Sequence, residues 1–523
     1  MKRIILASML VLSFVSKSNA QTKVFKEVSN SISTSVRPIL QDNTLVGYLS
    51  FTELERANAD SFHYRLDIMD ENLNDIGKLE FTELKLDLQS VAFEQDVLCL
   101  AYLKSNFIGY GTMKRRERKE HLRTASVSVF TQFVGLDGKI IKTNTVKVNV
   151  KMLTAYNSVS YDRTQMGSGG LKHGVQLRNM AGKGFVCFYG DESKSYLTVY
   201  NTEGKDIWHK DFLLGAESYN ILPSNHDIFL LYRKKEKLWE GGYWLTGYNM
   251  DTNKSFDKVE LCDKNGHSFA VRTFENDPVS GRPFLSGSIL HPRKGNAAWT
   301  VKQLAKGPFT GVFTAQVKGE GTSKMETIVS DWSDHAQPDF TSKGRYKPSK
   351  SIMYFEPGFK DYEGNNYFAA STFKRKPRWG AIAALVTTAP LIYPPLYIIQ
   401  FTGTQKSQAR EAMLFKQDKK GKLTMVNTIP TTYSSYVTSR MASVGLRPDF
   451  YNAVNSETKS NYLIITDKKN VNVYNVKQQK IIRTIPRKDG SVTTTIYPAK
   501  EGHIMVSEYD KKEKTRKFSI EAL

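Results

Sequence analysis

Two carboxylates beside a histidine are the residues best placed for acid–base chemistry. Asp331 and Asp334 lie three residues apart, and His335 follows directly. Paired carboxylates can act as acid and base on a glycosidic bond, so this trio would suit an envelope enzyme that hydrolyses acidic glycans. The same residues are equally typical of a polar loop, and 52 acidic residues make such neighbours common by chance. We therefore assign no catalytic residue and do not favour an enzyme.

Metal sites have less support. The nine histidines are scattered, without the His-Glu-x-x-His pair of zinc enzymes. Asp70, Asn72 and Asn74 resemble the start of a calcium loop, but Asp75 stands where that loop needs Gly and Phe81 where it needs Glu. A hairpin turn explains this stretch better. The sequence predicts no metal and no cofactor.

The three cysteines suit core packing rather than chemistry. Cys99, Cys187 and Cys262 lie in apolar runs typical of buried strands, and their spacing contains no Cys-x-x-Cys. Buried thiols are usually inert. An odd number of cysteines cannot all pair, so we predict that no disulfide framework holds the fold.

The chain carries a large basic excess, with a formal charge of +22. This charge predicts attraction to polyanions, which for an exported protein are lipopolysaccharide, acidic glycans and stray DNA; specific nucleic-acid binding is not expected. Basic clusters stand at 114–119, 233–237 and 511–517. Each cluster includes an acid, which is typical of solvated loop tips.

Short strands explain most of the regular pattern. Apolar and polar residues alternate at 84–89, 146–151 and 471–474, which is the period of a strand with one buried face. Helical periodicity is scarce, and we expect helices only at Met113–Arg123 and Gln405–Phe415. The sequence therefore predicts an all-β fold.

A turn pattern recurs along the chain and indicates repeated hairpins. Asp, Asn or Gly residues, which adopt left-handed turn conformations at low cost, stand between apolar arms at 136–144, 200–208, 248–256, 361–371, 417–425 and 474–482. A hairpin unit recurring at roughly 60-residue intervals cannot bury its apolar face alone. We predict a β-propeller-like domain over 21–523 with about seven or eight blades, the alternative being two β-sandwich domains. The glycine-rich run at 166–170 lacks the pattern of a nucleotide-binding loop and suits a connection between blades.

The N-terminus predicts export. Lys2 and Arg3 precede an apolar stretch, and Ser18-Asn19-Ala20 fits a small-x-small cleavage site. We expect residues 1–20 to be a signal peptide and the mature chain to begin at Gln21. The periplasm, the outer-membrane surface or the medium would then be its location.

A second apolar segment interrupts the strand pattern at 379–401. It is long enough to cross a bilayer, but Pro390, Pro394 and Pro395 would break an ideal helix. A basic cluster at 374–378 precedes it, as in interfacial membrane anchors. We interpret the segment as an apolar insertion, either packed on the domain or exposed to contact a membrane or partner.

Four stretches, at 93–107, 171–179, 304–313 and 497–509, resemble segments of an uncharacterised exported family of Gram-negative bacteria. The resemblance covers essentially the whole mature chain and implies export and a shared propeller-like architecture. It transfers no activity, cofactor or site residue. The stretch at 361–371 is also similar to an Asp-x-x-Gly-Asn-x-Tyr pattern of some secreted bacterial propellers, which bears on the fold alone.

These observations favour an exported binding or scaffold protein of unknown ligand. Its loops and the 379–401 segment would contact a membrane, an envelope component or a partner protein. The alternatives are an envelope enzyme acting on acidic glycans and a protein that binds polyanions through charge.

Overall fold

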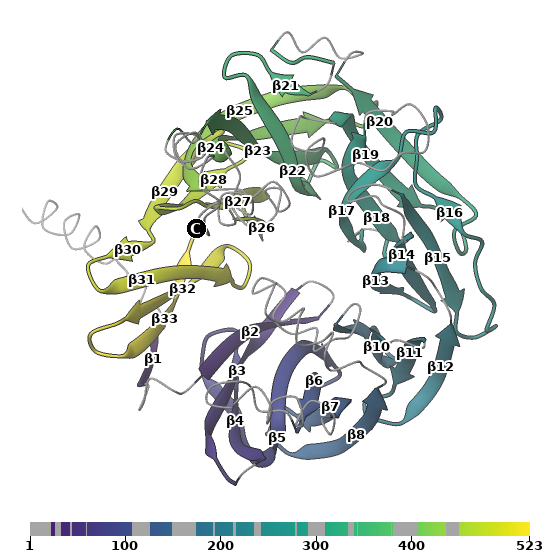
Figure 1. The fold of residues 1–523 in the computed structure, drawn as a ribbon, viewed down its shortest axis with the longest axis vertical. Coiled ribbons are helices and arrows are strands. Elements are labelled where there is room, and N and C mark those ends of the chain that lie inside the picture. Colours follow the sequence, from purple (N-terminus) through teal and green to yellow (C-terminus); the bar gives the residue numbers. More distant parts are fainter. Residues whose placement is uncertain are drawn as a thin grey trace, which may run out of the picture.

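The computed structural model of the protein is a ring of small antiparallel sheets around a common axis (Figure 1). Every named element of the described part is a β-strand, so the all-β prediction is confirmed. In the same part of the chain, no helix has the length and apolar character of a membrane span. The residues that the structure describes are 22–26, 33–41, 44–58, 60–106, 126–148, 174–191, 194–212, 216–234, 242–277, 280–290, 309–332, 339–342, 344–377, 379, 405–435 and 449–523.

The described strands form eight blades, each with four main strands that run from a first strand near the axis to a fourth strand at the rim (Figure 1). Blades 6 and 8 each have one further short strand. Blades 1 and 2 contain β2 (Ser33–Gln41), β3 (Thr44–Arg56), β4 (Ser61–Asp70), β5 (Asp75–Glu94), β6 (Val97–Ser105), β7 (Val127–Gly135) and β8 (Ile140–Val148). Blades 3 and 4 contain β9 (Val175–Met180), β10 (Gly184–Gly190), β11 (Ser195–Tyr200), β12 (Asp206–Phe212), β13 (Ala216–Ser224), β14 (Asp227–Lys234), β15 (Tyr243–Asn249) and β16 (Val259–Glu260).

The other four blades repeat this pattern. Blades 5 and 6 contain β17 (Phe269–Asn276), β18 (Pro283–Leu290), β19 (Phe309–Val317), β20 (Met325–Asp331), the short β21 (Arg345–Tyr346), β22 (Ser351–Lys360), β23 (Asn366–Pro377), β24 (Gln405–Gln417) and β25 (Leu423–Ser435). Blades 7 and 8 contain β26 (Asp449–Asn455), β27 (Ser460–Thr466), β28 (Asn470–Asn475), β29 (Lys480–Pro486), the short β30 (Lys488–Asp489), β31 (Val492–Pro498), β32 (His503–Asp510), β33 (Thr515–Ala522) and β1 (Thr22–Lys26).

Blades 1 and 2 share one long strand, β5, which joins them into a seven-stranded sheet. Residues 75–84 pair with β4 as the fourth strand of blade 1, and residues 85–94 pair with β6 as the first strand of blade 2. The alternation at 84–89 lies at this changeover, where Leu86 and Leu88 are buried and Asp87 is exposed. A period-two pattern thus continues from one blade into the next without a turn.

The N-terminal strand β1 closes the ring. It pairs antiparallel with β33, with Thr22 opposite Ser519 and Lys26 opposite Thr515, and so supplies the fourth strand of blade 8. Phe25 meets Phe518 edge-on, with ring centroids 5.5 Å apart. The two ends of the described chain therefore share a sheet, which connects blade 8 to the strands that begin blade 1.

Eight buried apolar clusters lie among the described residues, one between each pair of neighbouring blades. The last of these joins β3 and β4 of blade 1 to β32 and β33 of blade 8 through Tyr48, Met69, Met505 and Phe518, all almost fully buried. Because each blade packs on both neighbours, its second strand is buried on both faces, as in β10 and β18. Two separate sandwiches would lack such a continuous series of interfaces, so the propeller prediction is confirmed.

The six predicted hairpin turns all occur in the structure. The carboxylate of Asp418, for example, accepts the backbone N–H groups of Lys420 (2.9 Å) and Lys422 (2.8 Å) between β24 and β25. Between β7 and β8, Gly138 has a φ of +83°, and a Cβ there would lie 2.3 Å from the carbonyl oxygen of Lys78. Glycine is therefore required at this turn by both conformation and space.

Other sequence predictions have mixed outcomes. The helix predicted at Gln405–Phe415 is wrong, because this stretch is β24, paired with β23 on one side and β25 on the other. Two cysteines, Cys99 and Cys187, are buried in one apolar cluster as predicted, and burial raises the pKa of the Cys187 thiol to about 12. The third, Cys262, is only half-buried and lies outside the named strands. The predicted helix at Met113–Arg123, the signal peptide at 1–20 and the run at 166–170 lie outside the described residues.

Ring closure can be tested with two substitutions in β1. Phe25→Ala removes the ring that packs on Phe518, and we expect a loss of about 1–3 kcal/mol in the free energy of unfolding, measured by urea denaturation. Val24→Ala is the matched control, because Val24 is 55% exposed on the other face and should cost less than about 0.5 kcal/mol. Equal effects of the two substitutions would contradict closure through β1.

Candidate functional site

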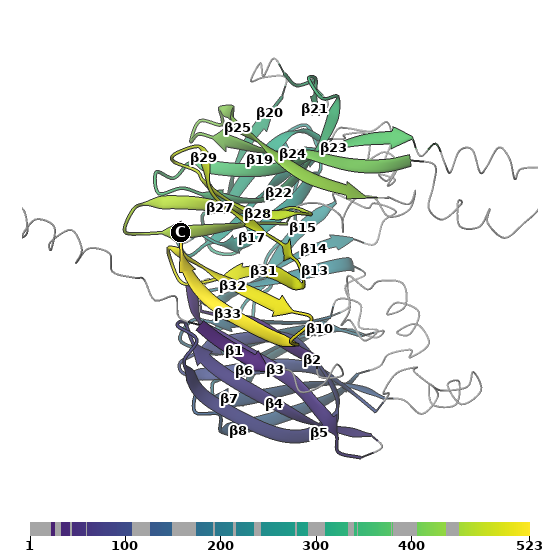
Figure 2. The same cartoon turned by 90° about the vertical axis from the view of Figure 1, so that its left-hand side faces the viewer.

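The two faces of the ring differ in how the strands connect. The first and second strands of each blade meet at one face in short turns, such as 180–184 and 498–503, and we call this the turn face. Strand ends on the opposite face flank the longer connections, including those at 107–125, 149–173 and 380–404. Figure 2 shows the β23–β24 hairpin reaching away from the turn face.

Side chains on the first strands bond directly to the backbone of the next first strand. Gln176 of β9 donates from Nε2 to the carbonyl oxygen of Tyr219 (2.6 Å), and its Oε1 accepts the N–H of Ile221 (3.2 Å). One amide thus pairs with two backbone groups of β13, as a neighbouring strand would. Thr273 of β17 does the same with both backbone groups of Gly358 in β22. These bonds fix neighbouring blades at the axis.

Further polar links join blades at the turn face. The carboxylate of Glu94, only 2% exposed, accepts the N–H of Gly182 (2.9 Å) and Nδ2 of Asn179 (3.2 Å). Around the closure, the Tyr48 hydroxyl donates to the carbonyl oxygen of Pro498 (3.1 Å). Each hydrogen bond gives a partner to a buried polar group, which would destabilise the fold if it were left unpaired. These bonds therefore stabilise the contacts between blades at the turn face.

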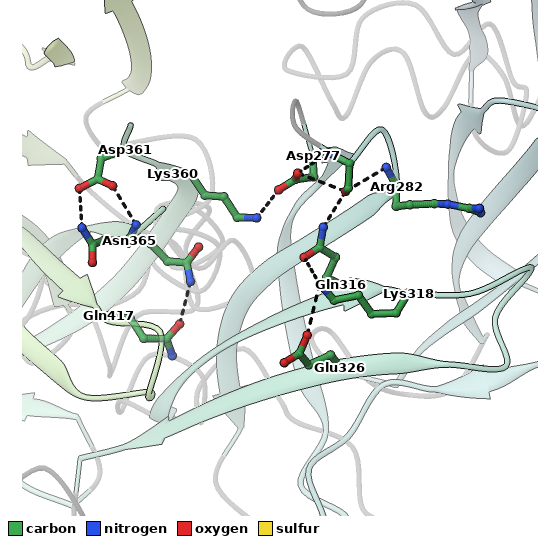
Figure 3. Close-up of polar contacts among 11 residues, drawn as sticks. Asp277, Arg282, Gln316, Lys318, Glu326, Lys360, Asp361, Asn365 and Gln417 are labelled. Carbon is green, nitrogen blue, oxygen red and sulfur yellow. Dashed lines mark hydrogen bonds and ion pairs between the residues drawn. The ribbon is translucent and has the colours of Figure 1, made fainter. Parts of the chain in front are cut away.

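Blades 5 and 6 are joined by an ion pair that Figure 3 shows. Lys360, the last residue of β22, bonds to the carboxylate of Asp277, which follows β17. Burial raises the pKa of Asp277, but Lys360 and two hydrogen bonds from Ser280 outweigh that effect and hold the pKa below its ordinary value. Lys360 also lies over the ring of Phe284, with 4.4 Å from Nζ to the centroid. This lysine is therefore fully engaged within the fold.

Among the charged first-strand side chains that the structure describes, four are exposed, and we call them the axial charges: Arg37 on β2, Asp87 on β5, Arg178 on β9 and Glu275 on β17. The first strands contact one another in sequence, β2 with β5, β5 with β9, β9 with β13 and β13 with β17, so these residues share the surroundings of the axis. The ring brings together charges that are about 50 to 100 residues apart in sequence.

For Asp87, Arg178 and Glu275, neighbouring protein atoms remove part of the hydration despite the exposure of these side chains. Loss of hydration raises the pKa of both Asp87 and Glu275, and it lowers the pKa of Arg178. Nearby positive charges act against the rise in the two carboxyl pKa values. Arg37 lowers the pKa of Asp87, and Lys360 and Arg178 lower the pKa of Glu275. Solvent reaches the groups, but they lie among many protein atoms, as residues lining a propeller axis would.

These shifts have a defined sign for stability. A carboxyl group whose folded pKa is raised binds more protons in the folded state than in the unfolded state, so stability falls as the pH rises through that pKa. Ionising Asp87 or Glu275 therefore costs more in the folded protein than in the unfolded chain. Ionisable residues that lower the stability of the fold are typical of binding sites. The axial charges are therefore the best candidate site among the described residues.

The residues singled out in the sequence do not gather into a site in the described part. Asp331 lies half-buried at the end of β20, whereas Asp334 and His335 lie outside the described residues. Asp70 accepts the backbone N–H groups of Asn72 and Asn74 (both 2.8 Å) in the β4–β5 hairpin, which confirms the turn. No group of three potential metal ligands occurs in the part of the chain searched.

Sequence reasoning missed the axial charges as a group because each lies on a different strand. No motif surrounds Arg178 or Glu275, and their common feature is an exposed charge within a mostly buried first strand. The alternation at 84–89 did include Asp87, as the polar face of a strand. Only knowledge of which strands are first in their blades would have linked the four residues.

The fold defines the protein as an eight-bladed β-propeller in its described residues. Residues 1–393 match a family of unknown function, DUF6770, and the chain belongs to that family. The resemblance to an uncharacterised family is thus confirmed. A search of curated proteins finds no match.

Several solved structures are similar to the chain at low identity. The Dos1 propeller has a TM-score of 0.41 and 8% identity, covering 95% of this chain and 94% of that one. The WD40 domain of SCAP from fission yeast has a TM-score of 0.37 and 7% identity, covering 94% and 98%. A protein of unknown function from Bacteroides caccae has a TM-score of 0.27 and 10% identity, covering 61% and 80%. None of these similarities carries a functional argument.

Proposed function

We propose that this protein is an exported binding or scaffold protein that holds a polar ligand or partner at the axis of its propeller. The observation that carries the proposal is the set of axial charges, which four different blades contribute and three of which lose part of their hydration in the fold. Such a surface exists only when the ring is assembled. The bonds from Gln176 and Thr273 would hold it rigid, which reduces the ordering cost of binding.

Export is supported by the position of the closing strand. The signal-peptide prediction places the mature N-terminus at Gln21, and β1 begins at Thr22. Cleavage after Ala20 would therefore leave β1 whole and able to pair with β33. In an envelope location, the ligands that fit the +22 excess are lipopolysaccharide or acidic glycans.

A second contact is proposed for the apolar segment at 379–401. Residues 380–401 lie outside the described residues, but Trp379 is 73% exposed. The flanking strands β23 and β24 remain paired up to Pro377 and Gln405, on the side opposite the turn face. A membrane or protein bound there would leave the turn face free. No observation of the described residues favours the alternative of a glycan-hydrolysing enzyme.

Neutralising the axial charges tests the binding function. We expect the variant with Arg37→Gln, Asp87→Asn, Arg178→Gln and Glu275→Gln to lose about tenfold or more in affinity for immobilised lipopolysaccharide or acidic glycans from the producing cells, because charged hydrogen bonds at the axis are lost. Biolayer interferometry on residues 21–523 measures the affinity. The control carries Lys147→Gln, Lys480→Gln, Glu80→Gln and Glu326→Gln, which are exposed on outermost strands.

The control variant changes the same number of charges of each sign and should bind as the unaltered protein does. Equal binding by all three proteins would contradict a site at the axis. An equal loss in both variants would assign the attraction to overall charge, which also falls steeply as salt rises.

Deleting Ala381–Ile399 tests the second contact. We expect the thermal unfolding midpoint to stay unchanged, because the β23–β24 pairing survives, while co-sedimentation with envelope fractions is abolished. Mass spectrometry of the N-terminus, expected at Gln21 in both proteins, serves as the control for export. Unchanged fractionation after the deletion would refute the contact.

A further inference from the structure

Arg178 lies exposed on β9, and its guanidinium makes no hydrogen bond and no ion pair with any described residue. Surrounding protein removes part of its hydration and lowers its pKa. A guanidinium with five donors in such a setting is a strong site for an anion, because the ligand would replace water that the protein already displaces in part.

The neighbouring charges cannot satisfy Arg178. Glu275 on β17 interacts with it electrostatically, but no ion pair joins the two side chains. Lys360 is held by Asp277 and the Phe284 ring, so it stabilises the region without competing for a ligand. Arg178, on the first strand of blade 3, and Glu275, on the first strand of blade 5, are therefore not paired with each other.

The first strand between them also has an exposed polar residue. β13 of blade 4 presents Asn220, which is exposed while Tyr219 and Ile221 on either side are buried. An amide can donate to an anion and accept from its hydroxyl groups. Three consecutive blades therefore present a guanidinium, an amide and a carboxylate at the axis.

Resting on the proposed binding function, we propose that Arg178 is the anchor for an acidic group of the ligand, a carboxylate or a phosphate, bound at the axis. Guanidinium binds both of these groups through two parallel hydrogen bonds. Glu275 limits the affinity, because its negative charge lies near the bound anion. Its role is to discriminate against densely charged polyanions, in contrast to attraction by the overall basic charge.

The test uses three small probes that share one sugar ring: glucuronate, glucose 6-phosphate and neutral glucose. Affinities for residues 21–523 are measured by ligand-observed NMR titration. We expect binding of glucuronate, glucose 6-phosphate or both, and none of glucose; the two acids distinguish a carboxylate site from a phosphate site. Arg178→Gln should weaken the binding about 10- to 100-fold, because charged hydrogen bonds are lost.

Two further variants serve as controls for the effect of Arg178→Gln on binding affinity. Glu275→Gln removes the repelling charge and should tighten binding of the acidic probe, whereas Lys147→Gln on the exposed face of β8 should change nothing. Equal affinities of Arg178→Gln and Lys147→Gln would overturn the assignment. Failure of both acids to bind, with retention on envelope glycans preserved, would refute the anion site and leave the binding function standing.

Discussion

Burial of apolar surface between neighbouring blades is the constraint on which the rest of the structure depends. A single blade has two apolar faces and no core of its own, so each of the eight clusters needs strands from two blades. The cluster between blades 8 and 1 is the critical one, because it unites β3 and β4 with β32 and β33. The ring closes when β1 completes blade 8 and brings Phe25 onto Phe518.

Polar interactions at the axis serve two different purposes. Gln176 and Thr273 form hydrogen bonds with backbone groups of the next first strand. These bonds stabilise the fold and leave none of the groups involved without a partner. Arg178 and Glu275 also lie on first strands, but their side chains form no hydrogen bond or ion pair with a described residue. Because Gln176 and Thr273 fix the blades, Arg178 and Glu275 are held at defined positions while their side chains stay available for a ligand. That division is the structural basis of the binding site that we propose at the axis.

The local structure of this protein was predictable because its turns carry strong local signals. The carboxylate of Asp418 accepts backbone N–H groups of its turn, and Gly138 has a positive φ that few other residue types adopt cheaply. Such residues allow the hairpins to be placed from sequence. Ring closure could not be placed, since β1 and β33 lie at opposite ends of the chain and only tertiary packing joins them. The stretch at 405–415 gave the wrong structure, because pairing with strands on both sides overrode its helical character.

The candidate site was unpredictable for a related reason. Its members are single charges within ordinary strands, and the repeat places them together only after the blades have assembled around the axis. Local motifs such as Asp331 with its acidic neighbour suggested chemistry, whereas the described structure uses comparable motifs, such as Asp70 with Asn74, for turns.

Hydrogen exchange measured by mass spectrometry tests the closed ring most directly. If β1 and β33 are integral to the eighth interface, peptides covering 22–26 and 515–522 will exchange as slowly as those from the buried strands β10 and β18, through global unfolding alone. Exchange in β1 and β33 that is orders of magnitude faster, with β10 and β18 still protected, would show an open ring and contradict this account.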